Sequence, residues 1–131
     1  MEKIRKNYIC KYQVKKGKSG TRELINFFKN GYSVALMIDQ RVSEGETIQL
    51  FNRSAKTTTI PAQLIKKYNT RVVPVYIERI KNINFKITFD NPIKFNKELS
   101  TKQISLELNK ILEKMILRNP DQWIWTHDRW K

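Results

Sequence analysis

Two short, uninterrupted apolar runs constrain the fold of this chain more than any other feature of its sequence. They cover residues 34–38 and 72–77, and both are shorter than an ordinary helix. Continuous apolar runs of this length are typical of strands that are buried on both faces of a parallel sheet. Pro74 lies inside the second run, so that strand is expected to begin there or to lie at an edge.

Three helical patterns surround these runs. The first begins at Ser19 and stops at Asn30-Gly31, and the second begins near Pro61 and closes at Asn69. The third begins at a capping box over residues 100–103 and ends before Pro120. Its apolar side chains recur at helical spacing: Ile104, Leu108, Ile111, Leu112, Met115 and Ile116.

The remaining segments are less regular. Residues 1–16 predict a short strand or a helix end, and residues 40–56 predict a polar, turn-rich loop with an apolar island at 48–51. Residues 85–89 alternate between apolar and polar, which indicates a half-exposed antiparallel strand. The order of elements predicts an α/β fold in three layers. We expect one domain over residues 1–131, which supplies only part of the sheet.

The charge balance predicts an anionic partner. The chain has 26 Lys and Arg against 12 Asp and Glu, a net charge of +14. Nucleic acid, an anionic membrane face or a phosphorylated substrate would suit this charge, although a generally Lys-rich proteome would also produce it. The sequence has no helix-turn-helix pattern, zinc knuckle or RNP-like aromatic motif, so nucleic acid is not the expected partner. A small basic α/β module that binds nucleic acid nevertheless stays open as the alternative.

Several kinds of chemistry are not expected. Cys10 and His127 are the only cysteine and histidine, so neither an internal disulfide nor a Cys/His zinc site can form, and no cofactor is expected. His127 is interpreted as structural. Asp128 is adjacent in sequence, but adjacency alone does not place its carboxylate against the imidazole. The basic segment 15–19 lacks phosphate-loop spacing. We expect no signal peptide at residues 1–6, and no apolar run is long enough to span a bilayer.

Two groups of polar residues are candidates for substrate binding. Asp39, Gln40 and Arg41 follow the run at 34–38, and ligands of open α/β sheets gather beyond the carboxyl ends of strands. The hydroxyls and backbone amides of residues 57–59, which are Thr57, Thr58 and Thr59, open the second helix and could hold a phosphate or carboxylate. The alternatives are a solvated loop for the first group and simple capping for the second.

Four segments in order resemble the late acyltransferases of lipid A biosynthesis, of the lauroyl or myristoyl transfer type. Residues 34–40 resemble that family's hydrophobic strand ending in Asp-Gln, and residues 72–76 its Val-Val-Pro-Val strand. Residues 50–62 resemble its Phe-Phe-Gly and Ala-x-Thr-Thr-x-Pro-Ala stretch, except that Asn52 stands in place of the glycine. Residues 119–131 resemble its C-terminal Pro-Glu-Gln-Trp-x-Trp-x-His-x-Arg-Trp-Lys signature.

The resemblance implies a glycerolipid-acyltransferase-like sheet with flanking helices. It implies transfer of a fatty acyl chain from acyl carrier protein to a hydroxyl of a lipid A precursor, a phosphorylated glycolipid, in lipopolysaccharide biosynthesis. It also implies peripheral attachment to an anionic membrane surface, the cytoplasmic face of the cell inner membrane. The family's catalytic His-x-x-x-x-Asp/Glu motif is missing from these residues. We therefore expect a C-terminal fragment of a longer enzyme, or a product of a split or decayed gene, with no catalytic residue of its own.

Overall fold

The computed structural model describes residues 2–15 and 17–131, so Met1 and Lys16, in the two basic segments discussed above, lie outside the described residues. The chain divides into two compact units, Met1–Leu36 and Met37–Lys131. None of the described helices is both long enough and apolar enough to cross a bilayer.

The first unit is helical. It contains α1 (Glu2–Tyr8) and α2 (Lys18–Lys29), so the ambiguous segment at the start of the chain forms a helix. The second helix ends as predicted, with Asn30 as its C-cap and Gly31 at a φ of 83°. Beyond α1, the rings of Tyr12, Phe27 and Tyr32 pack with centroids 5.0–5.5 Å apart.

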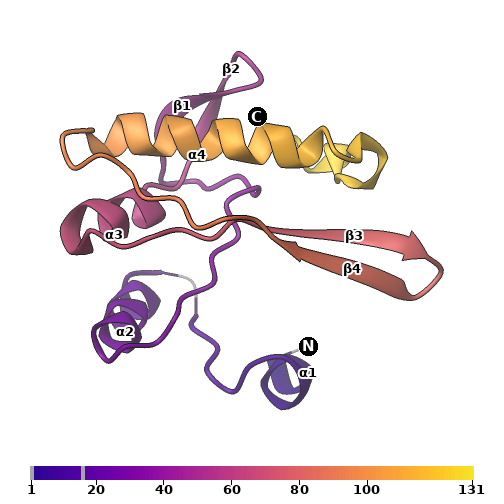
Figure 1. Ribbon diagram of the computed structural model, residues 1–131, viewed down its shortest axis with the longest axis horizontal. Coiled ribbons are helices and arrows are strands. Elements are labelled where there is room, and N and C mark those ends of the chain that lie inside the picture. The colour runs from indigo at the N-terminus through magenta and orange to yellow at the C-terminus, as the bar shows by residue number, and fades with distance from the viewer. Residues whose placement is uncertain (1, 16) are drawn as a thin grey trace. The chain divides into compact units, whose positions relative to one another are not determined.

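The second unit contains two antiparallel hairpins and two helices (Figure 1). The first hairpin pairs β1 (Glu46–Leu50) with β2 (Arg53–Thr57), and the second pairs β3 (Val75–Lys81) with β4 (Asn84–Phe89). The helices are α3 (Ile60–Tyr68) and α4 (Thr101–Ile116), and two short 3-10 turns, Pro120–Gln122 and Trp125–His127, follow α4.

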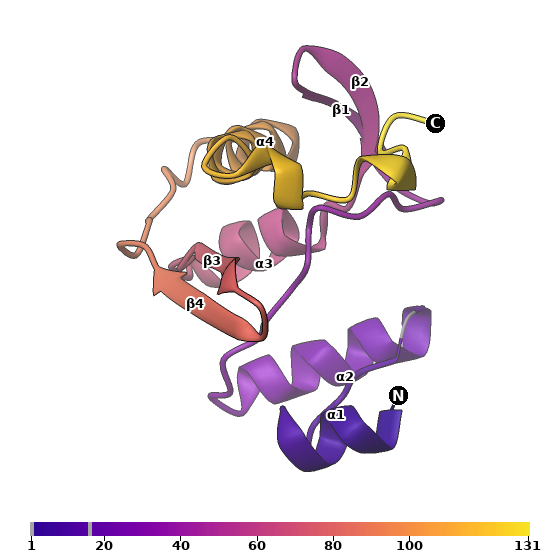
Figure 2. The same cartoon turned by 90° about the vertical axis from the view of Figure 1, so that its right-hand side faces the viewer.

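Helix α4 is the centre of this unit. Figure 2, which looks nearly along its axis, shows the β1–β2 hairpin and α3 at different sides of it. Two apolar clusters result, one at each side, and both include buried residues of α4. The cluster on the hairpin side contains Leu50, Ala55, Leu112 and Ile116. The cluster on the α3 side contains Ala62, Ile65, Ile104 and Leu108, and Ile38 packs against both clusters.

The mixed α/β class is confirmed, but the central parallel strand predicted at residues 34–38 is wrong. That segment is extended and unpaired in the described structure, and Met37 is 79% exposed. A parallel strand needs neighbours to bond its amides and carbonyls, and no parallel pair of strands occurs within residues 2–15 and 17–131. The described sheets are therefore small and antiparallel, and a three-layer arrangement is not observed.

The second predicted strand begins next to Pro74. Val72 forms an isolated antiparallel bridge with Ile93, and regular pairing starts at Val75, immediately after Pro74. Proline has no backbone N–H to donate to a ladder, so it lies at the start of the strand, as its position suggested. The strand pairs with the antiparallel β4, and none of its residues is fully buried. The prediction of a half-exposed antiparallel strand at residues 85–89 is confirmed by β4.

The prediction of a loop over residues 40–56 is wrong for its second half, where the β1–β2 hairpin forms. Its two turn residues, Phe51 and Asn52, have φ values of 51° and 56°. Two-residue turns with positive φ match the right-handed twist of paired strands. Side chains of Ile48, Leu50 and Ala55 then alternate into the core.

Both helices of the second unit follow the sequence. Asn69 adopts a left-handed conformation at the end of α3, and Pro61 lies in its first turn. At α4 the predicted capping box is complete: Gln103 N–H donates to the Ser100 hydroxyl at 3.2 Å, and Ser100 N–H donates to Gln103 Oε1 at 2.8 Å.

Candidate functional site

A buried arginine from the C-terminal tail is the centre of the candidate site. Arg129 is only 1% exposed. Its Nη1 donates to the carbonyl of Lys56, and its Nη2 donates to the hydroxyl of Thr57 at 3.1 Å. Burial lowers the pKa of Arg129, and the charge of Asp39 opposes that shift. The tail thus supplies a buried positive charge close to the first group of predicted binding residues.

Thr57 is a structural partner of this arginine. Its hydroxyl donates to the Ala55 carbonyl at 3.2 Å and accepts from both Arg129 and Asn109 Nδ2, the latter at 3.3 Å. A hydroxyl has one hydrogen to donate and two lone pairs, so all of its bonding capacity is used. Asn109 Nδ2 also donates to the Gln49 carbonyl at 2.8 Å, which connects α4 to β1.

The loop of Asp39, Gln40 and Arg41 is held by the same tail. The backbone N–H of Arg41 donates to Nε2 of His127 at 3.2 Å. Asp39 is half-buried, whereas the side chains of Gln40 and Arg41 are exposed. His127 therefore acts as a hydrogen-bond acceptor for the backbone, a contact of the structural kind expected for it. The loop exposes the Gln40 amide and the Arg41 guanidinium to solvent, while its backbone is bonded to His127.

Thr58 and Thr59 lie at the start of α3, and both are half-buried. The Thr58 hydroxyl accepts from the backbone N–H of Ile60 at 3.4 Å, and the Thr59 hydroxyl accepts from Gln63 Nε2 at 3.0 Å. Thr59 is the N-cap residue, but its side chain makes no capping bond. The helix therefore has no side-chain cap, and the Thr58 bond is a local turn contact at its first N–H. Of the three threonines, only Thr57 contacts the buried arginine.

Aromatic side chains of the tail cover the β1–β2 turn. Trp130 Nε1 donates to the Leu50 carbonyl at 3.0 Å, and the guanidinium of Arg53 lies 5.1 Å from the Trp130 ring centroid. The rings of Phe51 and Trp130 are 6.4 Å apart, and Trp123 meets Trp125 edge to face at 4.6 Å. These tryptophans pack against a hairpin that the sequence had not predicted.

Sequence reasoning missed two polar residues of the site, Arg129 and Asn109. Asn109 lies beside Leu108 and Leu112 on the buried side of α4, where a polar residue is an exception, and that exception was a usable signal. Arg129 belongs to the C-terminal signature segment at residues 119–131, but no periodic pattern marked it as buried. Within the described residues, three polar atoms near this cluster make no hydrogen bond: Ser105 Oγ, Asn109 Oδ1 and Arg129 Nε.

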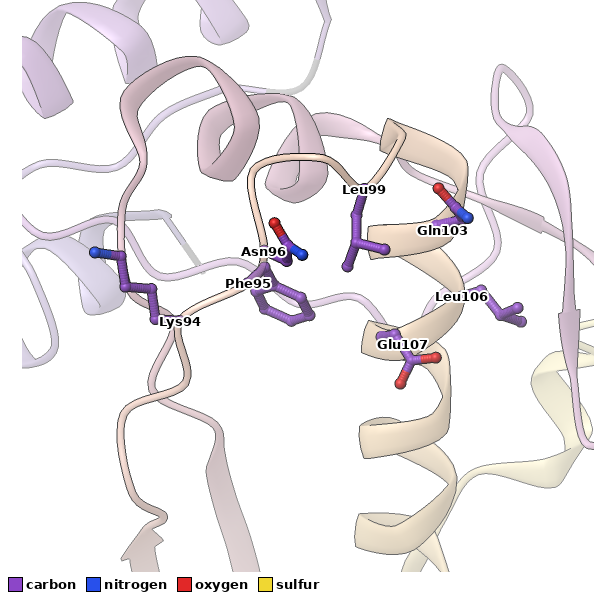
Figure 3. Close-up of a pocket in the computed structure, with 7 residues that line it drawn as sticks. All are labelled: Lys94, Phe95, Asn96, Leu99, Gln103, Leu106 and Glu107. Carbon is purple, nitrogen blue, oxygen red and sulfur yellow. The ribbon is translucent and has the colours of Figure 1, made fainter.

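A separate pocket lies between the segment before α4 and the first turns of that helix (Figure 3). Its lining mixes apolar side chains with one cation and one carboxylate: Lys94, Phe95, Asn96, Leu99, Gln103, Leu106 and Glu107. None of the predicted binding residues lines this pocket. It is therefore distinct from the Asp39–Arg129 site.

Comparison with known proteins identifies a family. The family model described as "Bacterial lipid A biosynthesis acyltransferase" matches residues 5–131. No curated protein matches the chain. The match includes both predicted groups of binding residues and the tail that holds them.

Proposed function

This chain belongs to the bacterial lipid A biosynthesis acyltransferase family, and on that basis we propose its part in the reaction. The reaction moves a fatty acyl chain from acyl carrier protein to a hydroxyl of a lipid A precursor. The polypeptide contributes the surface that binds the phosphorylated glycolipid acceptor. It works peripherally at the cytoplasmic face of the inner membrane.

One observation carries this proposal. The C-terminal tail makes contact with both predicted groups of binding residues, since Arg129 binds Thr57 and His127 accepts from the backbone of Arg41. These residues are more than seventy positions apart in sequence. A tail that bonds to the loop backbone through His127 and to Thr57 through a buried arginine is suited to positioning both groups of residues for a ligand.

Each residue then has a distinct part. The exposed guanidinium of Arg41 is suited to a phosphate of the glycolipid, because its fork of donors matches phosphate geometry. Gln40 offers an amide to sugar hydroxyls. Thr58 and Thr59 lie at the N-terminal end of α3. Asp39 interacts electrostatically with Arg129, which bonds to Thr57, and the net charge of +14 suits both the acidic carrier and the phosphorylated acceptor.

We further propose that these 131 residues do not transfer an acyl chain by themselves. The family's reaction needs a histidine whose general-base role is supported by an acid five positions later. The His-x-x-x-x-Asp/Glu pattern does not occur within these residues, and Nε2 of their one histidine, His127, already accepts from Arg41 N–H. A separate polypeptide or segment would have to supply the pair.

The test combines binding with turnover. The purified chain is titrated with a phosphorylated disaccharide lipid A precursor in detergent micelles, and binding is followed by isothermal calorimetry. We expect binding that Arg41→Gln weakens by about tenfold, since a charge-assisted hydrogen bond contributes roughly 1.5–3 kcal/mol. Arg71→Gln is the matched control, because it removes the same charge from an exposed position at the end of α3. Acyl transfer from acyl carrier protein is measured in parallel and is expected to be absent.

Two results would contradict the proposal. Equal binding by the Arg41→Gln and Arg71→Gln variants would show that general charge, and not this loop, attracts the glycolipid. Salt-dependent binding of DNA or RNA together with no affinity for the glycolipid would favour a nucleic-acid-binding module instead. Turnover by the isolated chain would refute only the expected inactivity, and not the proposed binding of the glycolipid.

A further inference from the structure

The bond between His127 and the loop at residues 39–41 forms in only one protonation state of the histidine. The backbone N–H of Arg41 donates to Nε2 of His127 at 3.2 Å. A backbone N–H is always a donor, so Nε2 must accept, and the neutral ring then carries its hydrogen on Nδ1. An imidazolium ring has a hydrogen on both nitrogens and no acceptor left. Protonation of His127 would therefore turn this bond into a contact between two donors.

The tail is fixed on both sides of His127 without help from its ring. Before it, the indole N–H of Trp125 donates to a backbone carbonyl of the tail at 2.9 Å. After it, Arg129 donates to the Thr57 hydroxyl at 3.1 Å. An indole N–H and a guanidinium both keep their hydrogens at neutral pH. A change in the charge of the imidazole would thus leave the tail in place and act on the loop.

The loop depends on the ring for its backbone contact. Among the described residues, the backbone of residues 39–41 makes no other hydrogen bond than the one from Arg41 to His127. The half-buried side chain of Asp39 interacts electrostatically with Arg129, but that interaction does not engage the Arg41 end of the loop. Loss of the bond would therefore free the backbone that carries the Arg41 guanidinium.

The surroundings of the contact are charged, but they contain one type of side chain that titrates near neutral pH. The charged groups of the loop, the tail, β2 and α4 near the contact are Asp39, Arg41, Asp128, Arg129, Lys131, Arg53 and Glu113. Of all these side-chain types, only histidine ordinarily changes its charge between about pH 5 and pH 8. A protonated His127 would also place a second positive charge beside Arg41, and like charges repel.

We propose that His127 is a pH-dependent anchor of the loop that carries Arg41. The neutral ring holds the loop, and the protonated ring releases it. The inference rests on the proposed function, in which Arg41 binds a phosphate of the glycolipid, and deepens it by naming how this site is regulated. His127 is a positioning residue in this scheme, because it acts through the backbone of Arg41.

The direction of the pH dependence follows from the chemistry of the ring. The bond exists only while the ring is neutral, so the loop is ordered on the alkaline side of the range and is released as the pH falls. The buried bonds of Arg129 do not change with it. A guanidinium on a released loop must be ordered again when it binds a phosphate, and this ordering lowers the affinity.

Amide exchange of the free chain tests the anchor without any ligand. Exchange with solvent is measured by NMR at about pH 8 and about pH 5, the limits between which histidine changes its charge. Each rate is compared with that of an unstructured peptide at the same pH, which removes the ordinary pH dependence of exchange. We expect the protection of the Arg41 amide to fall by about fivefold on acidification. The Ile104 amide, bonded inside α4, is the internal reference and should keep its protection.

Two variants separate protonation of the ring from a merely structural role. His127→Gln retains an oxygen that can accept from Arg41 N–H and does not titrate, so the protection of Arg41 should not change with pH. His127→Phe has no acceptor and should show low protection at both pH values. In the parent chain, the nitrogen-15 shifts of the imidazole should place the hydrogen of the neutral ring on Nδ1.

Three results would overturn the proposal. They are an Arg41 protection in the parent chain that is independent of pH, an equal fall of that protection in the parent and in His127→Gln, and a neutral ring with its hydrogen on Nε2. Failure of the proposed function is a separate observation, because the exchange measurement contains no glycolipid. It would appear as micelle binding that Arg41→Gln weakens no more than Arg71→Gln does.

Discussion

The guanidinium of Arg129 donates to the hydroxyl of Thr57 at 3.1 Å, which joins the C-terminal tail to the last residue of β2. This bond is made inside the protein, since both residues are almost fully buried. The tail is therefore part of the folded core of its unit, and its charge is matched to a particular pair of acceptors.

Replacing Arg129 by methionine should strongly destabilise the second unit. The substitution leaves the Lys56 carbonyl and the Thr57 hydroxyl short of a donor and removes the charge near Asp39. We expect a loss of about 2–4 kcal/mol in the free energy of unfolding, measured by urea denaturation. Lys131→Met, an exposed neighbour with the same change of side chain class, should stay within about 0.5 kcal/mol of the parent.

Asn109→Ala tests the connection between α4 and β1. It removes the donor to the Gln49 carbonyl and to Thr57 and should cost about 1–3 kcal/mol of unfolding free energy. Lys110→Ala changes the next residue of the same helix, which is exposed, and serves as the control. If both variants unfold at the same urea concentration, the Asn109 bonds do not stabilise the unit.

A substitution in the β1–β2 turn should stabilise the second unit. Asn52 has a φ of 56°, a backbone conformation that glycine adopts at no steric cost. Glycine is also the residue favoured at the second position of such turns. We expect Asn52→Gly to raise the melting temperature, with a gain of about 0.5 kcal/mol, and Asn52→Ala to lower it, by about 1 kcal/mol. An alanine variant as stable as the glycine one would show that the backbone conformation is not the cause.

His127→Phe should loosen the loop that carries Arg41. The substitution removes the acceptor of the Arg41 N–H, a bond of 3.2 Å, but keeps an aromatic ring. Amide hydrogen exchange at Arg41 is expected to accelerate by about fivefold, the equivalent of roughly 1 kcal/mol. Exchange at Ile104, inside α4, provides the internal reference and should not change.

The raised pKa of Tyr76 predicts that the stability of the fold depends on pH in the alkaline range. Burial raises the pKa of Tyr76 above its ordinary value of 10.0, and Glu78 adds to this effect while Arg118 opposes it. The folded chain then keeps the phenol proton at a pH where the unfolded chain has lost it, so stability falls as the pH rises through about 10. If another group causes the loss, the urea midpoint of Tyr76→Phe should fall across this pH by as much as that of the parent. We expect the phenylalanine chain to lose less.

Helices were the most predictable part of the fold, because their signals are local. The capping box at Ser100 and the left-handed Asn69 depend only on residues within one turn of the helix end. The strand expected at residues 34–38 failed for the opposite reason. An apolar run indicates burial or pairing only when neighbouring strands are present to accept it, and its own residues do not contain that information.

Some residues of the candidate site were singled out from the sequence, but Arg129, Asn109 and the arrangement of the site were not. Asp39 and Thr57 were both singled out, yet the residue between them, Arg129, follows a stretch of exposed tail and has no periodic pattern. Thr57 was expected to face a ligand, whereas its hydroxyl bonds to Arg129, Asn109 and Ala55. Contacts across some seventy residues are decided by tertiary packing, which single-sequence patterns do not encode.

The position of Arg129 and Trp130 in the sequence has a consequence for biosynthesis. The hairpin whose turn they cover precedes them by more than seventy residues, so the ribosome completes β1 and β2 long before it adds either side chain. Until then, a nascent chain holds the Leu50 carbonyl and the Thr57 hydroxyl without these donors. Folding of the second unit therefore cannot finish before both side chains have been added, and a premature stop before Trp130 would leave the hairpin as a target for quality control.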